Sequence, residues 1–461
     1  MAGIKSLFEP TDMTKGTPWK GIVAFSLPLL IGNIAQQLYS TVDSIVVGHF
    51  VGDDAIAAVG SALPLFNMLL VLFVGISAGV GIMVSQYFGA KDRENLSATI
   101  GTSITLTAIA ALFMMVVAPP FIEDLLILFN TPEEGGVLRD CTSYLLIMMY
   151  GGIGMAFYNI LSGILRGMGD SFSGLVYLLI ATVLNIGLDI LFVAAFDMGV
   201  SGVALATVIA QAISAALCYW KLMHMTEFFD LGWKQLKMRK THVKQIVRLG
   251  IPSGLTQMIF SSAMVVVQSL TNEFGKAFIT ANTIVMRVDG FAMMPNFSFG
   301  MAMTTYAGQN VGAQKPDRVK KGAKQGTLLA VICSAVITGI ILLFGKYLMR
   351  FFTQTDSIVN MSYHIMCILA VGYIAMAVTQ SLSGVMRGAG DTMTPMWISL
   401  MTTVLIRVPV AYGISFLTRT DELPHGISDC IPISLLFSWT IGALLTFVFY
   451  KVGRWKKKAI K

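Results

Sequence analysis

The chain has 461 residues, of which 55% are hydrophobic and only 12% are charged, and its formal net charge is +7. Soluble domains carry about 25% charged residues, so this composition excludes an ordinary soluble enzyme or binding domain. Gly21–Val42, Ile100–Phe121 and Ile431–Tyr450 contain no charged residue, and about 20 apolar residues let a helix cross a bilayer. Continuous apolar runs also argue against a strand barrel, whose segments are short and alternating.

Twelve membrane-spanning helices are predicted along the chain. Their centres lie near residues 34, 75, 108, 150, 184, 208, 258, 297, 333, 372, 403 and 441. The first 20 residues are polar and lack a small-residue cleavage site after a short apolar core, so we expect the first span itself to direct membrane insertion.

The basic residues separate the loops into two sets. The N-terminus, the loops after the even-numbered spans and the C-terminus hold 25 of the 32 lysines and arginines. Because cytoplasmic loops retain positive charge, both termini are predicted to face the cytoplasm, with the protein in the cell's inner (plasma) membrane. The net charge then reflects topology and contact with anionic lipid. It does not indicate nucleic-acid binding.

Two decapeptides reveal an internal duplication. "LSGILRGMGD" (Leu161–Asp170) and "LSGVMRGAGD" (Leu382–Asp391) share seven of ten residues, and "SQYFGAKDRE" from Ser85 resembles "GQNVGAQKPD" from Gly308. No strand precedes either copy, which disfavours a phosphate loop. We interpret each copy as a turn whose aspartate, Asp170 or Asp391, caps the next helix.

The repeat divides the chain into two six-helix lobes. The predicted parts are a cytoplasmic N-terminal segment (1–19), an N-lobe (20–220), a basic cytoplasmic linker (221–243), a C-lobe (244–450) and a basic tail (451–461). Six spans are an even number, so both lobes enter the membrane in the same sense. Such parallel repeats occur in secondary transporters, and the predicted fold is all-α with a central cleft between the lobes.

Three acidic residues fall well inside predicted spans: Asp43, Asp189 and Asp289. A charged carboxylate at the bilayer centre is costly, so an intramembrane acid is a functional candidate. Asp43 shares one face of the first span with Gln36 and Tyr39, at i, i+3 and i+7. The alternative for Asp43 and Asp189 is a purely structural acid that is neutral or paired with an arginine.

The second of these acids has polar neighbours one helical turn away. Asn185 and Asp189 are spaced i, i+4 on the fifth span, and Thr207 and Gln211 have the same spacing on the sixth. Buried carboxyl groups hold their protons more tightly, so Asp43 and Asp189 could take up a proton near neutral pH. Alternatively they could bind Na⁺ together with amide and hydroxyl oxygens.

Asp289 has two interpretations. It can form a structural charge pair with Arg407 on the eleventh span, because buried charges need partners, or it can be a second proton site. Near the start of the first span, Pro28 removes a backbone hydrogen bond and permits a kink. We therefore expect Pro28 to act as a hinge.

The duplicated LxGxxRGxGD element, its position after spans 4 and 10, and the acidic face of the first span resemble the multidrug and toxic compound extrusion (MATE) family over nearly the whole chain. In particular, Asp43, Asn185, Asp189 and Thr207 are similar to the N-lobe set of the branch akin to the DNA-damage-inducible F proteins. The NorM-like branch carries acids on the seventh and tenth spans. Here the seventh span has no acid before Glu273 at its outer end, and the tenth has none after Asp356. This difference argues against a NorM-type Na⁺ site in the C-lobe. The resemblance implies cation-coupled export of drugs and not an enzyme activity.

The sequence therefore predicts an antiporter, with H⁺ favoured and Na⁺ possible as the coupling ion, that exports lipophilic and often cationic molecules. Gln36, Tyr39 and Gln211 are the expected cavity residues, membrane lipid is the expected surrounding partner, and the expected state is a monomer without bound metal or cofactor. The alternatives are a flippase for a lipid-linked precursor, a membrane sensor that transports nothing, and, more remotely, a GxGD-type intramembrane aspartyl protease.

Overall fold

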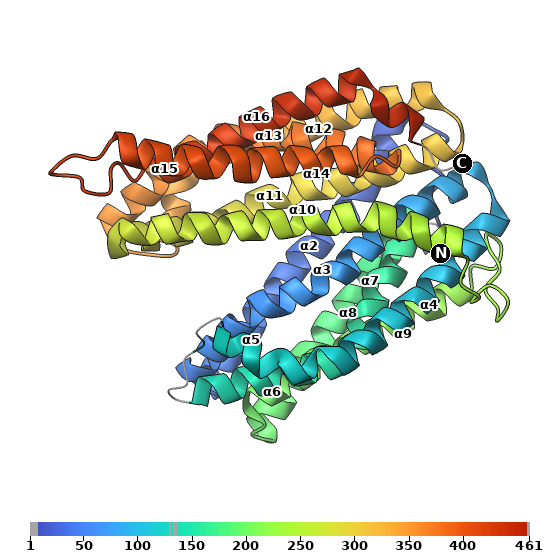
Figure 1. Cartoon of the computed structure of the whole chain (residues 1–461), viewed down its shortest axis with the longest axis horizontal. Helices are drawn as coiled ribbons and strands as arrows, with labels where there is room; N and C mark the ends of the chain where they lie inside the picture. The colour runs from blue at the N-terminus through green and yellow to red at the C-terminus, as the bar shows by residue number, and fades with distance from the viewer. Residues whose placement is uncertain (1–7, 129–130, 132–135, 459–461) are drawn as a thin grey trace. The chain divides into compact units, whose positions relative to one another are not determined.

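The computed structural model describes residues 8–128, 131 and 136–458, and the regular structure in this part of the chain is helical (Figure 1). Helices in the first part are α2 (Pro18–Phe50), α3 (Asp53–Ala90), α4 (Arg93–Val117), α5 (Ile122–Leu128), α6 (Val137–Tyr150), α7 (Gly152–Gly167), α8 (Phe172–Asp189) and α9 (Gly199–Met223). Those in the second part are α10 (Lys240–Glu273), α11 (Gly275–Gly312), α12 (Pro316–Arg350), α13 (Asp356–Gly388), α14 (Met393–Leu400), α15 (Arg407–Leu417) and α16 (Cys430–Val452). Two short 3₁₀ helices, η2 (Pro119–Phe121) and η6 (Arg454–Lys457), are also present.

Each predicted span centre falls within this helical pattern. Ten helices in the described chain are long and apolar enough to cross a membrane, or eleven when α6 and α7, bent by 52° at Gly151, count as one span. The 38-residue helix α11 is not among them, because Arg287 and Asp289 lower its hydropathy. The all-helical membrane fold is confirmed, and the number twelve stays a prediction.

Two compact units divide the chain, and their boundaries differ from those of the sequence halves. Unit 1 comprises Met1–Asp12 and Pro28–Gly254, and unit 2 comprises Met13–Leu27 and Leu255–Lys461. The first turns of α2 therefore belong to unit 2, and those of α10 belong to unit 1. In unit 1, a Cβ on Gly75 of α3 would lie 2.8 Å from the carbonyl oxygen of Gly250 of α10, so these two helices touch backbone to backbone.

The glycines of the decapeptides let helices approach closely. In unit 1, a Cβ on Gly163 would lie 2.5 Å from Ser77 Oγ, and one on Gly167 would lie 2.8 Å from the carbonyl oxygen of Gly81. In unit 2, the second copy repeats this packing. Gly384 abuts the Gly300 carbonyl and Gly388 abuts the Thr304 carbonyl. The glycines thus set the α3–α7 and α11–α13 contacts.

The end of each decapeptide confirms the expected turn and helix cap. Gly169 and Gly390 have φ of 91° and 92°, a region that side chains disfavour. Asp170 accepts hydrogen bonds from the amide and hydroxyl of Ser173 at 2.9 and 2.6 Å. Asp391 accepts the corresponding bonds from Thr394 at 3.3 and 2.8 Å. Burial raises the pKa of Asp170, while Ser173 and Lys221 oppose this shift.

A π-helix ends the fifth predicted span, and another interrupts the eleventh. Segment η4 (Ile190–Ala195) directly follows Asp189, and segment η5 (Met401–Ile406) directly precedes Arg407. Such segments are rare in proteins and are frequent at functional sites. Both place a buried charged residue beside an irregular helical turn.

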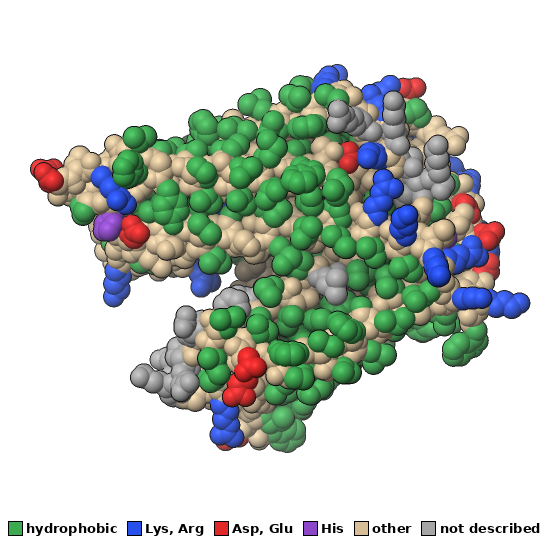
Figure 2. Space-filling view, viewed as in Figure 1, with side chains coloured by type: hydrophobic (Ala, Val, Ile, Leu, Met, Phe, Trp, Pro, Cys, Tyr) green, Lys and Arg blue, Asp and Glu red, His purple; other side chains and the backbone are tan. Residues whose placement is uncertain are grey.

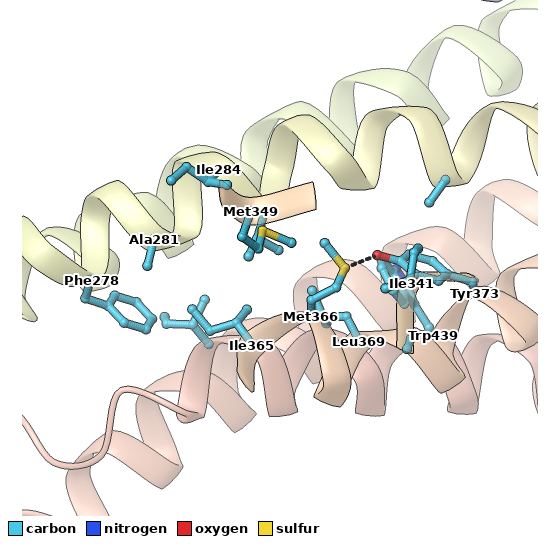
Figure 3. Packing of buried hydrophobic residues seen from close by; sticks show 14 of the residues in the cluster. Phe278, Ala281, Ile284, Ile341, Met349, Ile365, Met366, Leu369, Tyr373 and Trp439 are labelled. Carbon is cyan, nitrogen blue, oxygen red and sulfur yellow. Dashed lines mark hydrogen bonds between the residues drawn. The ribbon is translucent and has the colours of Figure 1, made fainter. Parts of the chain in front are cut away.

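Each unit has its own apolar core, as bilayer-embedded helices require. In unit 2, side chains from α11, α12, α13 and α16 meet around Tyr373 and Trp439 (Figure 3). A second core in unit 1 gathers residues of α3, α6 and α9, including Phe66, Tyr144 and Val203. Hydrophobic side chains also cover the outer faces of the helices in each unit, while charged side chains gather toward the helix ends (Figure 2). This distribution suits a lipid environment.

Candidate functional site

Helix α8 carries the acid of the predicted coupling site. Asn185 and Asp189 lie one turn apart on this helix, and both are fully buried in unit 1. They occupy its last two turns, immediately before the π-helix η4. The predicted i, i+4 arrangement is therefore present, and both residues interact with neighbouring groups.

Helix α9 packs against α8 (Figure 1). It carries the two predicted polar residues of the sixth span, Thr207 and Gln211. Thr207 and Gln211 are buried, with 5% and 8% of their surface exposed. Gln211 Oε1 is buried without a hydrogen-bond partner in the described chain. A buried amide oxygen of this kind costs free energy unless a ligand or water satisfies it, so Gln211 can contribute an acceptor to a ligand.

Tyr39 joins α2 to this cluster. Its hydroxyl donates a hydrogen bond of 3.0 Å to Thr207 Oγ1, across 168 residues of sequence. Gln36, one turn earlier on α2, is exposed. The hydrogen bond connects α2 to α9 within unit 1. Asp43 lies in helix α2, but its side chain is outside the part of the chain that the structure describes.

Pro28 lies inside the 33-residue helix α2 and does not end it. The boundary between the two compact units falls directly before this residue. The ring of Pro28 removes one donor from the helix ladder at this position. Its role as a hinge stays a prediction.

Asp289 and Arg407 lie within electrostatic reach of each other in unit 2. Arg407 is 9% exposed, and both Asp289 Oδ1 and Arg407 Nε are buried without a hydrogen-bond partner in the described chain. Tyr373 also interacts with the Asp289 carboxyl group, while its hydroxyl donates to Met366 Sδ at 2.9 Å (Figure 3). The pairing of Asp289 with Arg407, and its structural or proton-carrying role, stay predictions.

Sequence reasoning missed a set of polar contacts in unit 2 that also involves Tyr373. Asn296 of α11 accepts a 2.7 Å hydrogen bond from Ser334 of α12 and donates one of 3.2 Å to the Tyr373 carbonyl. Asn296 and Ser334 are polar residues in apolar helices, which is a weak signal by itself. Their partners lie on different helices, so the sequence could not pair them.

Two further kinds of possible site are a metal centre and a ligand pocket. Within residues 8–128, 131 and 136–458, no group of three or more His, Cys, Asp or Glu side chains could hold a metal ion. A small apolar pocket in unit 1 is lined by residues that include Phe66, Phe73, Met114 and Met149. None of the predicted cavity residues contributes to this pocket.

Comparison with known proteins gives consistent results over nearly the full length. The MatE family model matches residues 28–191 and again residues 252–413. The probable multidrug resistance protein YoeA of Bacillus subtilis is 30% identical over 454 residues, covering 97% of this chain and 96% of that protein. The probable multidrug resistance protein NorM of Thermotoga maritima is 25% identical, covering 96% and 94%.

A solved structure shows the same fold. The outward-facing conformation of a multidrug resistance MATE family transporter of the MOP superfamily superposes with a TM-score of 0.88. That match covers 97% of this chain and 99% of the other, at 23% sequence identity.

Proposed function

Because this chain belongs to the MatE family of membrane transporters, we propose that it is a cation-coupled antiporter that exports lipophilic, often cationic molecules by alternating access. Relatives that match nearly its whole length are named probable multidrug resistance proteins. We further propose that it lies in the cell's inner membrane with both termini in the cytoplasm, as its basic loops indicate. Protons are the favoured coupling ion.

The observation that carries the proposal is the buried polar cluster on α8 and α9 in unit 1. Asn185 and Asp189 are fully buried there, and Thr207 is tied to Tyr39 of α2. A carboxyl group inside a membrane protein marks an ion or proton pathway more often than a packing role. In sequence, Asp43, Asn185, Asp189 and Thr207 resemble the N-lobe set of the branch akin to the DNA-damage-inducible F proteins, and this resemblance supports the proposal.

The chemistry follows from competition for one carboxylate. When Asp189 is ionised, its negative charge favours a lipophilic cation in the cavity. When it is protonated, that attraction is lost and the substrate is released. Exchange of one proton for one monovalent cation moves no net charge, so the pH gradient drives it. The membrane potential adds about 2.3 kcal/mol per 100 mV for each net charge, and therefore contributes only when the substrate is neutral or when more protons than substrate charges cross.

Everted membrane vesicles supplied with a fluorescent cationic dye in the outer medium test this proposal directly, because their cytoplasmic face is outside and export appears as uptake of dye into the lumen. We expect an imposed pH gradient to drive dye transport, and a Na⁺ gradient alone to drive it less. Asp189→Asn removes the charge while retaining the shape, and it should abolish coupling, as should Asp43→Asn. Asp421→Asn changes an exposed acid in a loop and should leave transport unchanged.

The results separate the possible outcomes. If a Na⁺ gradient drives dye transport and a pH gradient does not, the coupling ion is Na⁺ and not H⁺. Gradient-driven transport that survives both Asp189→Asn and Asp43→Asn would rule out this cluster as the coupling site. Absence of dye transport with either gradient, together with movement of a lipid-linked precursor, would favour the flippase alternative.

A further inference from the structure

Residues 13–16, which lie just before α2, are bound in unit 2 through their backbone carbonyl groups. Arg318 of α12 donates to the carbonyl oxygens of Met13, Lys15 and Gly16 at 3.0, 2.9 and 2.9 Å. Lys315 donates to the carbonyl oxygen of Thr14 at 3.1 Å. Four consecutive carbonyl groups are therefore bound by two basic side chains at the start of α12.

Further contacts fix the same segment. The Met13 amide donates to Gln309 Oε1 at 2.8 Å, and Asn310 donates to the Met13 carbonyl at 3.2 Å. Arg318 Nε in turn donates to Asn310 Oδ1 at 3.0 Å. Met13 is 2% exposed. A buried backbone needs partners for its polar groups, and here side chains of unit 2 supply them.

The first turn of α2 is bound in the same way. The Trp19 amide donates to Gln325 Oε1 of α12 at 3.2 Å. The first four amides of a helix have no partner within it, so Gln325 supplies one from outside. The beginning of α2 is thus attached to α12, whereas the part of α2 from Pro28 onward belongs to unit 1.

Unit 1 contains a second arginine that performs the same task for α10. Arg93, the first residue of α4, donates to the carbonyl oxygens of Thr226 and Glu227 at 2.8 and 2.9 Å. It also forms a two-pronged contact with Asp230, at 3.0 and 2.7 Å. These three residues belong to the segment that leads into α10, and the Asp230 amide also donates to Ser97 Oγ of α4 at 2.9 Å.

The two arginines occupy similar places in the repeat. Each stands at the start of the third helix of its half, shortly after a non-glycine residue with positive φ, Lys91 at 56° or Gln314 at 55°. Arg318 binds the segment before α2, and Arg93 binds the segment before α10. Helix α2 begins in unit 2 and continues in unit 1, whereas α10 begins in unit 1 and continues in unit 2. A planar guanidinium with five donors suits this role, because it can bind several carbonyl oxygens at once.

We propose that Arg318 and Arg93 are positioning residues for transport, which clamp the entry segments of α2 and α10 so that these helices bend within their length instead of sliding at their base. The transport part of this inference rests on the proposed function. Helix α2 carries Tyr39 and Asp43. A bend at Pro28 moves the segment beyond it in a defined direction only if the preceding turns stay fixed.

The clamp itself is tested by hydrogen exchange on the full-length protein in detergent, without any transport measurement. In Arg318→Ala, amide exchange over residues 13–20 should accelerate at least about 10-fold, since several charge-assisted hydrogen bonds are lost. Exchange over residues 226–239 should not change. Arg93→Ala should give the converse pattern, and Lys320→Ala, which alters an exposed lysine on α12, should change neither region. Unchanged exchange over residues 13–20 in Arg318→Ala would overturn the clamp.

The positioning role is tested by dye transport in vesicles. Arg318→Ala should lower the maximal rate at least about 5-fold while KM and the pH midpoint of transport stay as in the wild type, because the ion site itself is intact. Arg318→Lys retains the charge with fewer directed donors, so it should restore the rate and the slow exchange in parallel and only in part. Full restoration of the rate with exchange still fast, or an altered pH midpoint, would show that Arg318 acts by its charge and not as a clamp.

The two experiments also distinguish failure of the inference from failure of the proposed function. If wild-type vesicles show no gradient-driven transport, the antiport proposal fails, and exchange over residues 13–20 still decides whether Arg318 holds this segment. If wild-type transport is present and Arg318→Ala transports at the wild-type rate despite fast exchange, the positioning role fails alone.

Discussion

Replacing Gly167 by alanine tests whether the decapeptide glycines are needed for helix packing. A Cβ at this position would lie 2.8 Å from the carbonyl oxygen of Gly81 and 2.8 Å from Cγ1 of Val84. Ordinary contacts of a Cβ begin near 3.4 Å. Helices α3 and α7 would therefore have to separate by several tenths of an ångström along their contact.

The magnitude follows from what that separation costs. Overpacking in a well-packed core costs about 1–3 kcal/mol, and the opposing atom here is a backbone carbonyl that cannot rotate away. Alanine is also a better helix former than glycine by about 1 kcal/mol, which offsets part of the loss. We expect a net destabilisation of about 1–2 kcal/mol for Gly167→Ala. Gly388→Ala should cost at least as much, because its Cβ would overlap the Thr304 carbonyl.

The assay is thermal unfolding of the purified protein in detergent, followed by intrinsic tryptophan fluorescence. Gly174→Ala is the matched control, since no heavy atom lies within 4 Å of its added Cβ, and it should be neutral or stabilising by up to about 1 kcal/mol. A Gly167→Ala midpoint equal to that of the Gly174→Ala protein would refute the packing argument. A lowered midpoint for both would instead point to a general intolerance of alanine.

Further predictions address the site and the linker. Pro28→Ala restores a hydrogen-bond donor to α2 and should slow dye export several-fold without weakening substrate binding; unchanged transport and pH dependence would exclude the hinge. Tyr39→Phe deletes the 3.0 Å hydrogen bond to Thr207 and should raise the KM for dye about 3- to 10-fold, as expected for loss of one bond of about 1 kcal/mol; an unaltered KM would show that this bond does not shape the site. Hydrogen bonds from Arg93 lower the pKa of Asp230 below its ordinary 3.8, so their contribution to linker attachment is present above about pH 4 and is lost as the pH falls further. A carboxyl titration by nuclear magnetic resonance should place the midpoint of Asp230 below 3.8 in the wild type and near 3.8 in Arg93→Ala, and equal midpoints would contradict the assignment.

Local features of this protein could be predicted from sequence because their causes lie within a few residues. Uninterrupted apolar runs identify helices long enough to cross a bilayer, and each predicted centre falls in the helical pattern. The cap formed by Asp170 with Ser173 depends on a spacing of three residues, so the motif alone predicts it. In the same way, the i, i+4 spacing of Asn185 and Asp189 predicts that they share one face of a helix.

The compact units of the structure follow other boundaries than the repeat. The sequence halves assign the base of α10 to the second lobe, yet residues up to Gly254 pack in unit 1, and Met13–Leu27 pack in unit 2. The sequence repeat is defined by similar residues in the two halves of the chain, whereas the compact units are defined by which residues lie in contact. The two divisions differ because the first helix of each half begins among the helices of the other.

The sequence by itself determined the helical membrane fold and the turn of each decapeptide. Only the tertiary structure decided that Tyr39 meets Thr207, that Gly167 abuts Gly81, and that Arg318 holds the carbonyl groups of residues before α2. These contacts join residues that are 86 to 305 positions apart. Helical periodicity specifies which face of a helix a residue occupies, but the partner of that face depends on how all the helices pack together.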